Sequence, residues 1–207
     1  MNKGGKYKAS GIESEFEPGS CGKVLKNLLG IKIQPELDRV EFIALKQAED
    51  KFQKLVHKDK HLTAENICNM HKMWLGKIYE WAGKYRLIDL EKKDIRFAHA
   101  QHISTLMDDF EKNFLRRHTP CTFNSKERII EALAEVHVEL IVIHPFREGN
   151  GRTIRLFLDL LSVHAKYNPI DWSKASHKEY INACIQGIAS NHKGMSHIIS
   201  KGLIKQR

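Results

Sequence analysis

Apolar side chains recur every three to four residues along most of the chain, which is the spacing of one face of an α-helix. The first such run places Leu37, Val40 and Ile43 on one face. It opens with Pro35, a residue that suits the first turn of a helix. The same spacing, or a capping sequence, marks the later segments. We predict helices over residues 35–55, 63–78, 101–118, 126–143, 150–163 and 177–190, and a last short helix after Gly194 that ends in the basic tail Lys201–Arg207.

One stretch departs from the helical pattern. Residues 85–90 and 95–97 alternate loosely between apolar and polar side chains, and the segment Glu91–Asp94 between them is polar throughout. This arrangement predicts a β-hairpin. The chain is therefore expected to be all-α apart from one small pair of strands.

The N-terminal region has a different composition from the rest. Residues 1–20 are rich in glycine, proline and charge, and we expect them to form an arm. A short helix is predicted over Val24–Leu29, with Gly30 ending it. The predicted organisation is an arm with a short helix in residues 1–34 and a single domain in residues 35–207.

The most unusual stretch joins two strongly apolar helical runs, Ile129–Ile143 and Ile154–Val163. Residues 144–155 read HPFREGNGRTIR. A plain connection between helices needs a proline and a glycine, which are the usual helix breakers. This one adds a histidine, a glutamate, a second glycine and three arginines, so we expect it to carry chemistry.

The first half of this stretch presents a proton acceptor. Pro145 cannot continue a helix and disfavours helical geometry in the residue before it, so His144 is expected at a helix exit. The pKa of an imidazole lies near neutrality, which suits a general base for a hydroxyl nucleophile. Gly149 and Gly151 allow the backbone to turn tightly and to approach a ligand closely.

The second half predicts an anion site. The next helix should begin at residues 150–152 with Asn150 as its N-cap, so free N–H groups and the positive end of the helix dipole would face the loop. Arg152 and Arg155 are three residues apart and could grip one phosphate chain. Glu148 beside a phosphate calls for a bridging cation, ordinarily Mg²⁺. Together these groups indicate transfer from a nucleotide to a hydroxyl.

The stretch resembles the signature of Fic-domain proteins, HxFx(D/E)GNG(R/K)xxR, at every defined position. The resemblance implies an all-α, Fic-type helical bundle with a small β-hairpin flap over the active site. It also implies a protein adenylyltransferase, which transfers AMP from ATP to a Ser, Thr or Tyr hydroxyl of a target protein and releases pyrophosphate. Kinase-like relatives carry lysine where Gly151 stands, so the glycine favours AMP transfer over phosphorylation. No Gly-Lys-Ser/Thr follows, which excludes a Walker-type phosphate loop.

The resemblance also implies a role for each residue. His144 would be the catalytic base that takes the proton of the target hydroxyl, Glu148 would hold Mg²⁺ on the phosphates, and Phe146 would be a buried anchor. The residues that would bind the phosphates of ATP are Gly149, Asn150, Gly151, Arg152 and Arg155. The first three of these would form an anion hole around the α-phosphate, and the two arginines would bind the outer phosphates.

Partners and regulation follow from the same resemblance. The hairpin at about residues 85–97 would be the flap that docks the target by strand addition; the alternative is an ordinary surface hairpin. Many Fic proteins restrain themselves with a helix bearing (S/T)xxxE(G/N). Neither end of this chain fits it, because Ser14 stands four residues after Ser10 and Gly194 four after Ser190. Two alternatives remain: inhibition in trans by a small antitoxin-like partner, or no restraint in a secreted effector.

Composition narrows the setting. The 207 residues, 42% of them hydrophobic, are enough for a proper core. Four cysteines without a CxxC pair indicate reduced thiols in the cytosol. The polar N-terminus and the lack of a long apolar run predict neither a signal peptide nor a membrane span. We therefore expect a cytoplasmic protein, with secretion into a host cell as the alternative.

Two other binding classes receive little support. The net charge of +9 permits contact with nucleic acid, but no dense Lys/Arg block or recognisable motif makes nucleic acid an expected primary partner. Twelve histidines occur without HExxH or cysteine partners, so zinc is not supported and all except His144 are expected to be structural. Two rivals to AMP transfer remain: transfer of another nucleotide or phosphate-linked moiety, and a catalytically idle protein that binds phosphate or a partner.

Overall fold

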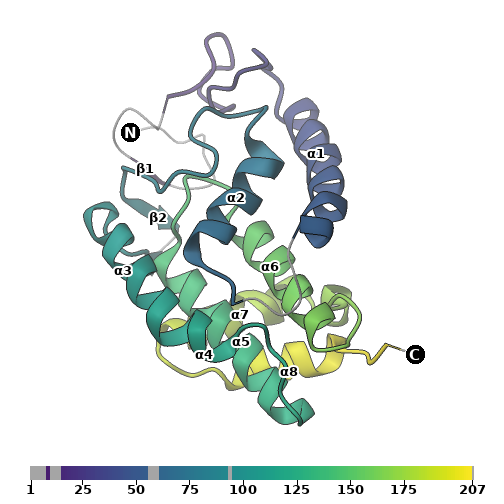
Figure 1. Cartoon of the computed structure of the whole chain (residues 1–207). Helices are drawn as coiled ribbons and strands as arrows, with labels where there is room; N and C mark the ends of the chain where they lie inside the picture. Colours follow the sequence, from purple (N-terminus) through teal and green to yellow (C-terminus); the bar gives the residue numbers. More distant parts are fainter. Residues whose placement is uncertain (1–7, 10–14, 56–60, 93–94, 207) are drawn as a thin grey trace. The chain divides into compact units, whose positions relative to one another are not determined.

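The computed structural model describes residues 8–9, 15–55, 61–92 and 95–206 (Figure 1). Most of them lie in α-helices, and the others lie in short strands, turns, 3-10 and π-helical segments and irregular loops. The predicted all-α architecture with one small hairpin is confirmed. Within these ranges no helix is both long enough and apolar enough to cross a membrane.

The principal helices lie close to where the periodicity placed them. Their bounds are α1 Gln34–Leu55, α2 Ala64–Leu75, α3 Ile103–Phe110, α5 Lys126–Ile143, α6 Asn150–His164, α7 His177–Ile188 and α8 Lys193–Gly202. The predicted helix over residues 101–118 is divided. It consists of α3, a π-helical stretch over Glu111–Leu115 and the short α4 over Arg116–His118.

The chain divides into two compact units. Unit 1 comprises residues 1–55, 65–105 and 145–149. Unit 2 comprises residues 56–64, 106–144 and 150–207. Residues 15–34 and α1 fall in the same unit, and a single domain over residues 35–207 stays a prediction.

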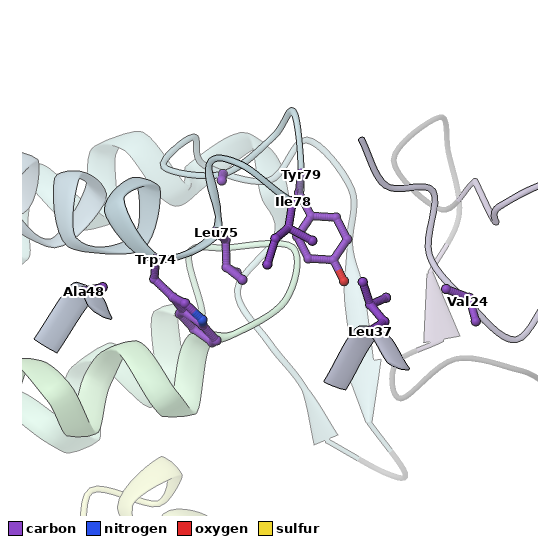
Figure 2. Close-up of a cluster of buried hydrophobic side chains, with 8 residues drawn as sticks. Val24, Leu37, Ala48, Trp74, Leu75, Ile78 and Tyr79 are labelled. Atoms are coloured by element: carbon purple, nitrogen blue, oxygen red, sulfur yellow. The ribbon is translucent and has the colours of Figure 1, made fainter. Parts of the chain in front are cut away.

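In unit 1, a cluster of buried apolar side chains joins α1 and α2 (Figure 2). Its members are Val24, Leu37, Ala48, Trp74, Leu75, Ile78, Tyr79 and Ala82. Glu41 of α1 is buried beside two of the aromatic rings. Its carboxylate accepts a hydrogen bond from the Tyr79 hydroxyl at 2.6 Å, and its backbone carbonyl accepts one from Trp74 Nε1 at 2.8 Å. Both rings therefore bury their apolar bodies while their polar ends stay satisfied.

The short helix predicted over residues 24–29 is wrong. Leu25 instead forms an antiparallel bridge with Phe16. The Asn27 side chain donates to the carbonyl oxygens of Leu25 at 3.1 Å and Ile31 at 2.9 Å, and it accepts a bond from the Ile31 N–H at 3.0 Å. An asparagine side chain that bonds to nearby backbone competes with helical hydrogen bonds. A segment of about six residues has too little helical stability to win that competition.

The predicted hairpin is confirmed, although its strands are shorter than the pattern suggested. Strand β2 (Leu90–Lys92) pairs antiparallel with β3 (Ile95–Arg96). The N-terminal arm adds a third strand, β1 (Lys8–Ala9), on the other side of β2, in the order β1-β2-β3. Sequence pattern did not predict β1, because a two-residue strand has no periodicity and its partner is distant in the chain.

In unit 2, α5 contacts α6, α7 and α8 (Figure 1). Helix α6 is buried on nearly every side, as its apolar sequence predicted. The buried apolar residues of α6 are Ile154, Leu156, Phe157, Leu158, Leu160 and Leu161. Gly187 brings α7 close to α5, because a Cβ atom there would lie 2.7 Å from Val138 Cγ2.

Two helix starts in unit 2 follow the capping rules. Ser125 precedes α5, and its side chain accepts a hydrogen bond from the Arg128 N–H at 3.2 Å. Ser176 and Glu179 form the complete capping box predicted for α7: each side chain accepts a hydrogen bond from the other residue's backbone N–H, at 3.2 and 2.8 Å. These bonds satisfy N–H groups that have no partner inside a helix.

Candidate active site

The stretch that the sequence singled out passes through both units. Its first residue, His144, and its last part, residues 150–155, belong to unit 2. Residues 145–149 belong to unit 1. Each part has its own supporting contacts within its unit.

His71 of α2 holds the loop of residues 145–149. Its ring stacks on Phe146, with centroids 3.9 Å apart and an angle of 11° between the planes. The backbone N–H of Gly83 donates to His71 Nδ1 at 2.8 Å, so the ring proton must be on Nε2, which faces the carbonyl oxygen of Glu148 at 3.0 Å. His71 is therefore a neutral structural residue. Phe146 is 1% exposed, so its predicted role as a buried anchor agrees with the structure.

Gly149 lies where the loop comes closest to α2. Its φ is +82°, a conformation that side chains disfavour. A Cβ atom there would lie 2.8 Å from Trp74 Cζ3 and 3.2 Å from Leu75 Cδ1. The backbone N–H of Gly149 donates to Glu148 Oε1 at 3.0 Å, and Glu148 is 8% exposed. Glycine is required here both for the turn and for the close approach.

Arg86 links the loop to the hairpin inside unit 1. Its backbone N–H donates to the Pro145 carbonyl at 2.9 Å. Its guanidinium is buried and donates to the carbonyls of Ile88 and Ala98, which lie just before and just after the paired strands. One side chain therefore joins the two ends of the hairpin, while its backbone holds the loop.

In unit 2, His144 ends α5 in a left-handed conformation, with φ 51° and ψ 60°. Its backbone N–H donates to the Leu140 carbonyl at 3.0 Å, and the residue is 5% exposed. The sequence predicted that His144 leaves the helix, and this is confirmed. A left-handed residue that is not glycine costs on the order of 1 kcal/mol or more, and such strain is typical of functional positions.

Helix α6 begins at Asn150, within the range predicted for its start. Asn150 is fully buried. Gly151 stands in the first turn beside open space, since a Cβ atom there would meet no described atom within 4 Å. The first turn of a helix has free N–H groups and the positive dipole end. This turn therefore has the properties of an anion site, with room next to its backbone.

The two arginines of α6 lie one turn apart and are both partly buried. The guanidinium carbon of Arg155 lies over the ring of Tyr180 on α7, 5.4 Å from its centroid. The structure therefore places Asn150, Gly151, Arg152 and Arg155 together in the first two turns of one helix. It packs that helix against α5, which ends at His144.

Comparison with known proteins identifies this arrangement. A model of the Fic/DOC family matches residues 61–162. The chain is 30% identical over 168 residues to y4lH of Sinorhizobium fredii, named a probable protein adenylyltransferase, and the match covers 81% of this chain and 85% of the relative. The chain belongs to the Fic/DOC family.

Two further Fic proteins are similar. The chain is 34% identical over 182 residues to the protein adenylyltransferase VbhT of Bartonella schoenbuchensis. That match covers 87% of this chain but only 37% of VbhT. The N-terminal Fic domain of a VirB-translocated Bartonella quintana effector, solved with bound ADP, superposes with a TM-score of 0.77 at 24% identity, covering 93% of this chain and 95% of that one. The Fic fold predicted from the motif is confirmed.

The Fic motif supplies few protein ligands for a metal. Among the described residues, no group of three or more His, Cys, Asp or Glu side chains could hold a metal ion. Mg²⁺ does not require such a group, because it commonly binds through one or two carboxylates together with substrate phosphates and water. Glu148 has one carboxylate oxygen occupied by the Gly149 N–H. A carboxylate has capacity for further partners, so Glu148 fits a Mg²⁺ site that is completed by a nucleotide.

A cavity of about 400 Å³ in unit 1 contains none of the Fic motif residues. Leu28, Trp81 and Leu87 supply apolar lining, while Lys26 and Glu80 are among the charged residues. Opposite charges line the same cavity, so its electrostatics select no ligand class. The motif residues remain the candidate site.

Three residues that support the Fic motif were missed by sequence reasoning: His71, Arg86 and Tyr180. His71 gave a usable signal, because it stands four residues after Ile67 on the apolar stripe of α2, where a polar group needs partners. Arg86 and Tyr180 gave no usable signal in the sequence. Their partners are distant in sequence, and only the folded chain brings them together.

Proposed function

We propose that this Fic-family chain is a protein adenylyltransferase, which transfers AMP from ATP to a Ser, Thr or Tyr hydroxyl of a target protein. Two relatives, VbhT and y4lH, carry that name, the second as a probable one. The neighbour from Bartonella quintana holds ADP. Its bound nucleotide supports ATP as the substrate here.

The observation that carries this proposal is the first turn of α6. Gly151 leaves open space beside a helix N-terminus, and Arg152 and Arg155 lie in the same two turns. Backbone N–H groups and guanidinium groups are the donors that phosphates bind best. This is a site for a chain of phosphates rather than for a single neutral ligand.

The chemistry divides between two ends of packed helices. At the C-terminal end of α5, His144 takes the proton from the target hydroxyl as its oxygen attacks the α-phosphorus of ATP. A new oxygen–phosphorus bond forms, the bond to the β-phosphate bridge breaks, and pyrophosphate leaves. The proposed anion hole around the α-phosphate comprises Gly149, Asn150 and Gly151. The Gly149 N–H bonds the Glu148 carboxylate, so the backbone donors come from Asn150 and Gly151, and the arginines of α6 bind the leaving phosphates.

Glu148 is the residue that would hold Mg²⁺. The ion, when bound, would neutralise charge on the phosphates. Glu148 is nearly buried and its backbone is fixed by His71, so its carboxylate has a defined position in unit 1. Glu148→Gln should therefore weaken the dependence of nucleotide binding on Mg²⁺.

The hairpin is the proposed docking surface for the target. Within the described residues, β2 pairs on both sides, whereas β3 pairs only with β2. An extended target segment would add to the free edge of β3 through backbone hydrogen bonds. Arg86 holds the two ends of this hairpin, which would keep the docked segment in a fixed place.

We infer a bacterial, cytoplasmic protein, since the similar Fic proteins named above come from bacteria, and we propose a small antitoxin-like partner that inhibits it in trans. Translocation into a host cell as an effector is the alternative, and the Bartonella quintana neighbour is named a VirB-translocated effector. Copurification of a small inhibitory protein would favour the first setting.

A labelling experiment tests the function. Purified protein would be incubated with Mg²⁺, a cell lysate and ATP labelled at either the α- or the γ-phosphate. We expect label on a protein band from the α-position alone, and none with His144→Ala. Label from the γ-position would show phosphorylation instead. Absence of both labels, with other nucleoside triphosphates also inactive, would favour the idle-binding alternative.

A further inference from the structure

Arg155 rests on an aromatic support within unit 2. Its guanidinium carbon lies 5.4 Å from the centroid of the Tyr180 ring, which is cation–π distance. The Tyr180 hydroxyl lies 2.8 Å from Nε2 of His137, which is on α5. The order of contacts is therefore Arg155, Tyr180, His137.

Both groups behind the arginine are uncharged. Complete burial, together with the nearby Arg155 charge, lowers the pKa of His137 to about 3, so its imidazole is neutral at physiological pH. Burial raises the pKa of the Tyr180 phenol, which therefore keeps its proton. A neutral ring offers Arg155 a cation–π face without an ion pair that would neutralise its charge. Neither Tyr180 nor His137 therefore adds a negative charge beside Arg155.

The support itself is firmly held. The capping box of Ser176 and Glu179 fixes the first turn of α7, which carries Tyr180. Trp172 packs edge-on against the Tyr180 ring, with centroids 6.2 Å apart, and its Nε1 donates to Asp159 Oδ1 at 3.1 Å. Asp159 stands one turn after Arg155 on α6. The ring is therefore tied to the helix whose arginine it supports.

We propose that Tyr180 is a positioning residue that holds Arg155 where it binds the outer phosphates of ATP. This inference rests on the proposed function, because it takes Arg155 as a phosphate ligand. Tyr180 acts through Arg155 and touches no reacting atom. Its effect is selective: it favours a nucleotide with β- and γ-phosphates over one that has only the α-phosphate.

A merely structural role for Tyr180 makes a different prediction. Loss of a side chain that only packs would destabilise unit 2 and would weaken the binding of AMP and of ATP analogues to the same extent. Loss of a positioning residue weakens the binding only of the ligand that Arg155 contacts. It also has no further effect once Arg155 is gone, since residues that act through one contact are not additive.

The experiment is a double-mutant cycle on the purified chain. Equilibrium binding of AMPPNP with Mg²⁺, and of AMP, would be measured for wild type, Tyr180→Leu, Arg155→Ala and the double variant. We expect Tyr180→Leu to lower the affinity for AMPPNP roughly tenfold, which is the scale of a partly desolvated cation–π contact. The affinity for AMP should change less than about twofold. The double variant should match Arg155→Ala.

Two further variants keep the test decisive. Tyr167→Phe removes a hydroxyl from unit 2 at a residue whose described hydrogen bonds run through its backbone, and it should bind both nucleotides as wild type does. If Tyr180→Leu does not fold, Tyr180→Phe keeps the ring and removes the hydroxyl. A smaller loss of AMPPNP binding, again absent in the Arg155→Ala background, is then expected.

Equal weakening of AMPPNP and AMP, or additive losses in the double variant, would overturn the role of Tyr180. So would unchanged AMPPNP binding in every Tyr180 variant. Failure of the proposed function is recognised separately. Wild-type protein would then transfer no α-label to any lysate protein, whereas the binding of AMPPNP and AMP could still be compared among the variants.

Discussion

The two halves of the Fic motif are built for opposite purposes. Residues 145–149 fill space: Phe146 stacks on His71, and Gly149 lies against Trp74 so closely that no side chain fits. Residues 150–155 leave space: Gly151 stands beside an opening at the start of α6. Two glycines only two positions apart are therefore needed for different reasons, one by the fold and one by the ligand.

This difference shows why a short motif can combine chemistry with precision. A site works when its reactive groups are held by packing and by supporting hydrogen bonds. In unit 1, His71 and Arg86 hold the loop backbone. In unit 2, Tyr180 lies against Arg155. Apart from Glu148, the proposed Mg²⁺ ligand, changing a residue of the filled half should damage folding, whereas changing Gly151 or an arginine of the open half should damage nucleotide binding.

The largest effect is expected for His144→Ala. Loss of the general base should lower the rate of AMP transfer by roughly a hundredfold or more, while AMPPNP binding survives. Steady-state transfer of α-label, compared with equilibrium binding, checks this. A variant that lost nucleotide binding to the same extent as Arg155→Ala would contradict the separation of roles.

Gly149→Ala should come next, through stability. The left-handed backbone and the contact with Trp74 should together lower the free energy of unfolding by about 3 kcal/mol. Urea denaturation followed by circular dichroism measures this loss. Wild-type stability in this variant would mean that the loop does not need its close approach to α2.

Arg155→Ala should lower the affinity for AMPPNP by roughly tenfold to a hundredfold, because hydrogen bonds from a charged donor are lost. The thermal midpoint should change little, because Arg155 is only partly buried. Calorimetric titration with AMPPNP supplies the measurement. Arg128→Ala, which removes an exposed arginine paired with Glu131, is the matched control and should bind normally.

Gly151→Ala should have the smallest effect and separates the two halves most sharply. Its added methyl group meets no described atom, and alanine is the better helix former, so stability should stay equal or rise by up to about 1 kcal/mol. AMPPNP binding should nevertheless fall several-fold, because the methyl group enters the proposed phosphate space. Unchanged binding would place the phosphates elsewhere.

The sequence predicted what depends on local pattern. Helices α1, α5 and α6 followed from apolar spacing, and the capping box of α7 followed from Ser176 and Glu179. The motif gave the family, and the roles of its site residues stay a prediction. The helix predicted at residues 24–29 is wrong because the Asn27 side chain forms hydrogen bonds with the backbone of nearby residues, and these replace helical hydrogen bonds.

What the sequence could not predict depends on contacts between distant segments. Strand β1 exists only through its pairing with β2. In the sequence, Arg86 looks like any polar residue before a hairpin. Only the structure shows that its guanidinium donates to the carbonyls of both Ile88 and Ala98. Tyr180 stands in an ordinary amphipathic helix, and its contact with Arg155 follows from the packing of α7 in unit 2.

The left-handed backbone of His144 has an evolutionary consequence. Glycine or asparagine would adopt φ 51° with less backbone strain. Random substitution without selection for catalysis would therefore tend to replace the histidine. A histidine held in this strained conformation is what the proposed catalytic role requires, as a trade-off between stability and activity.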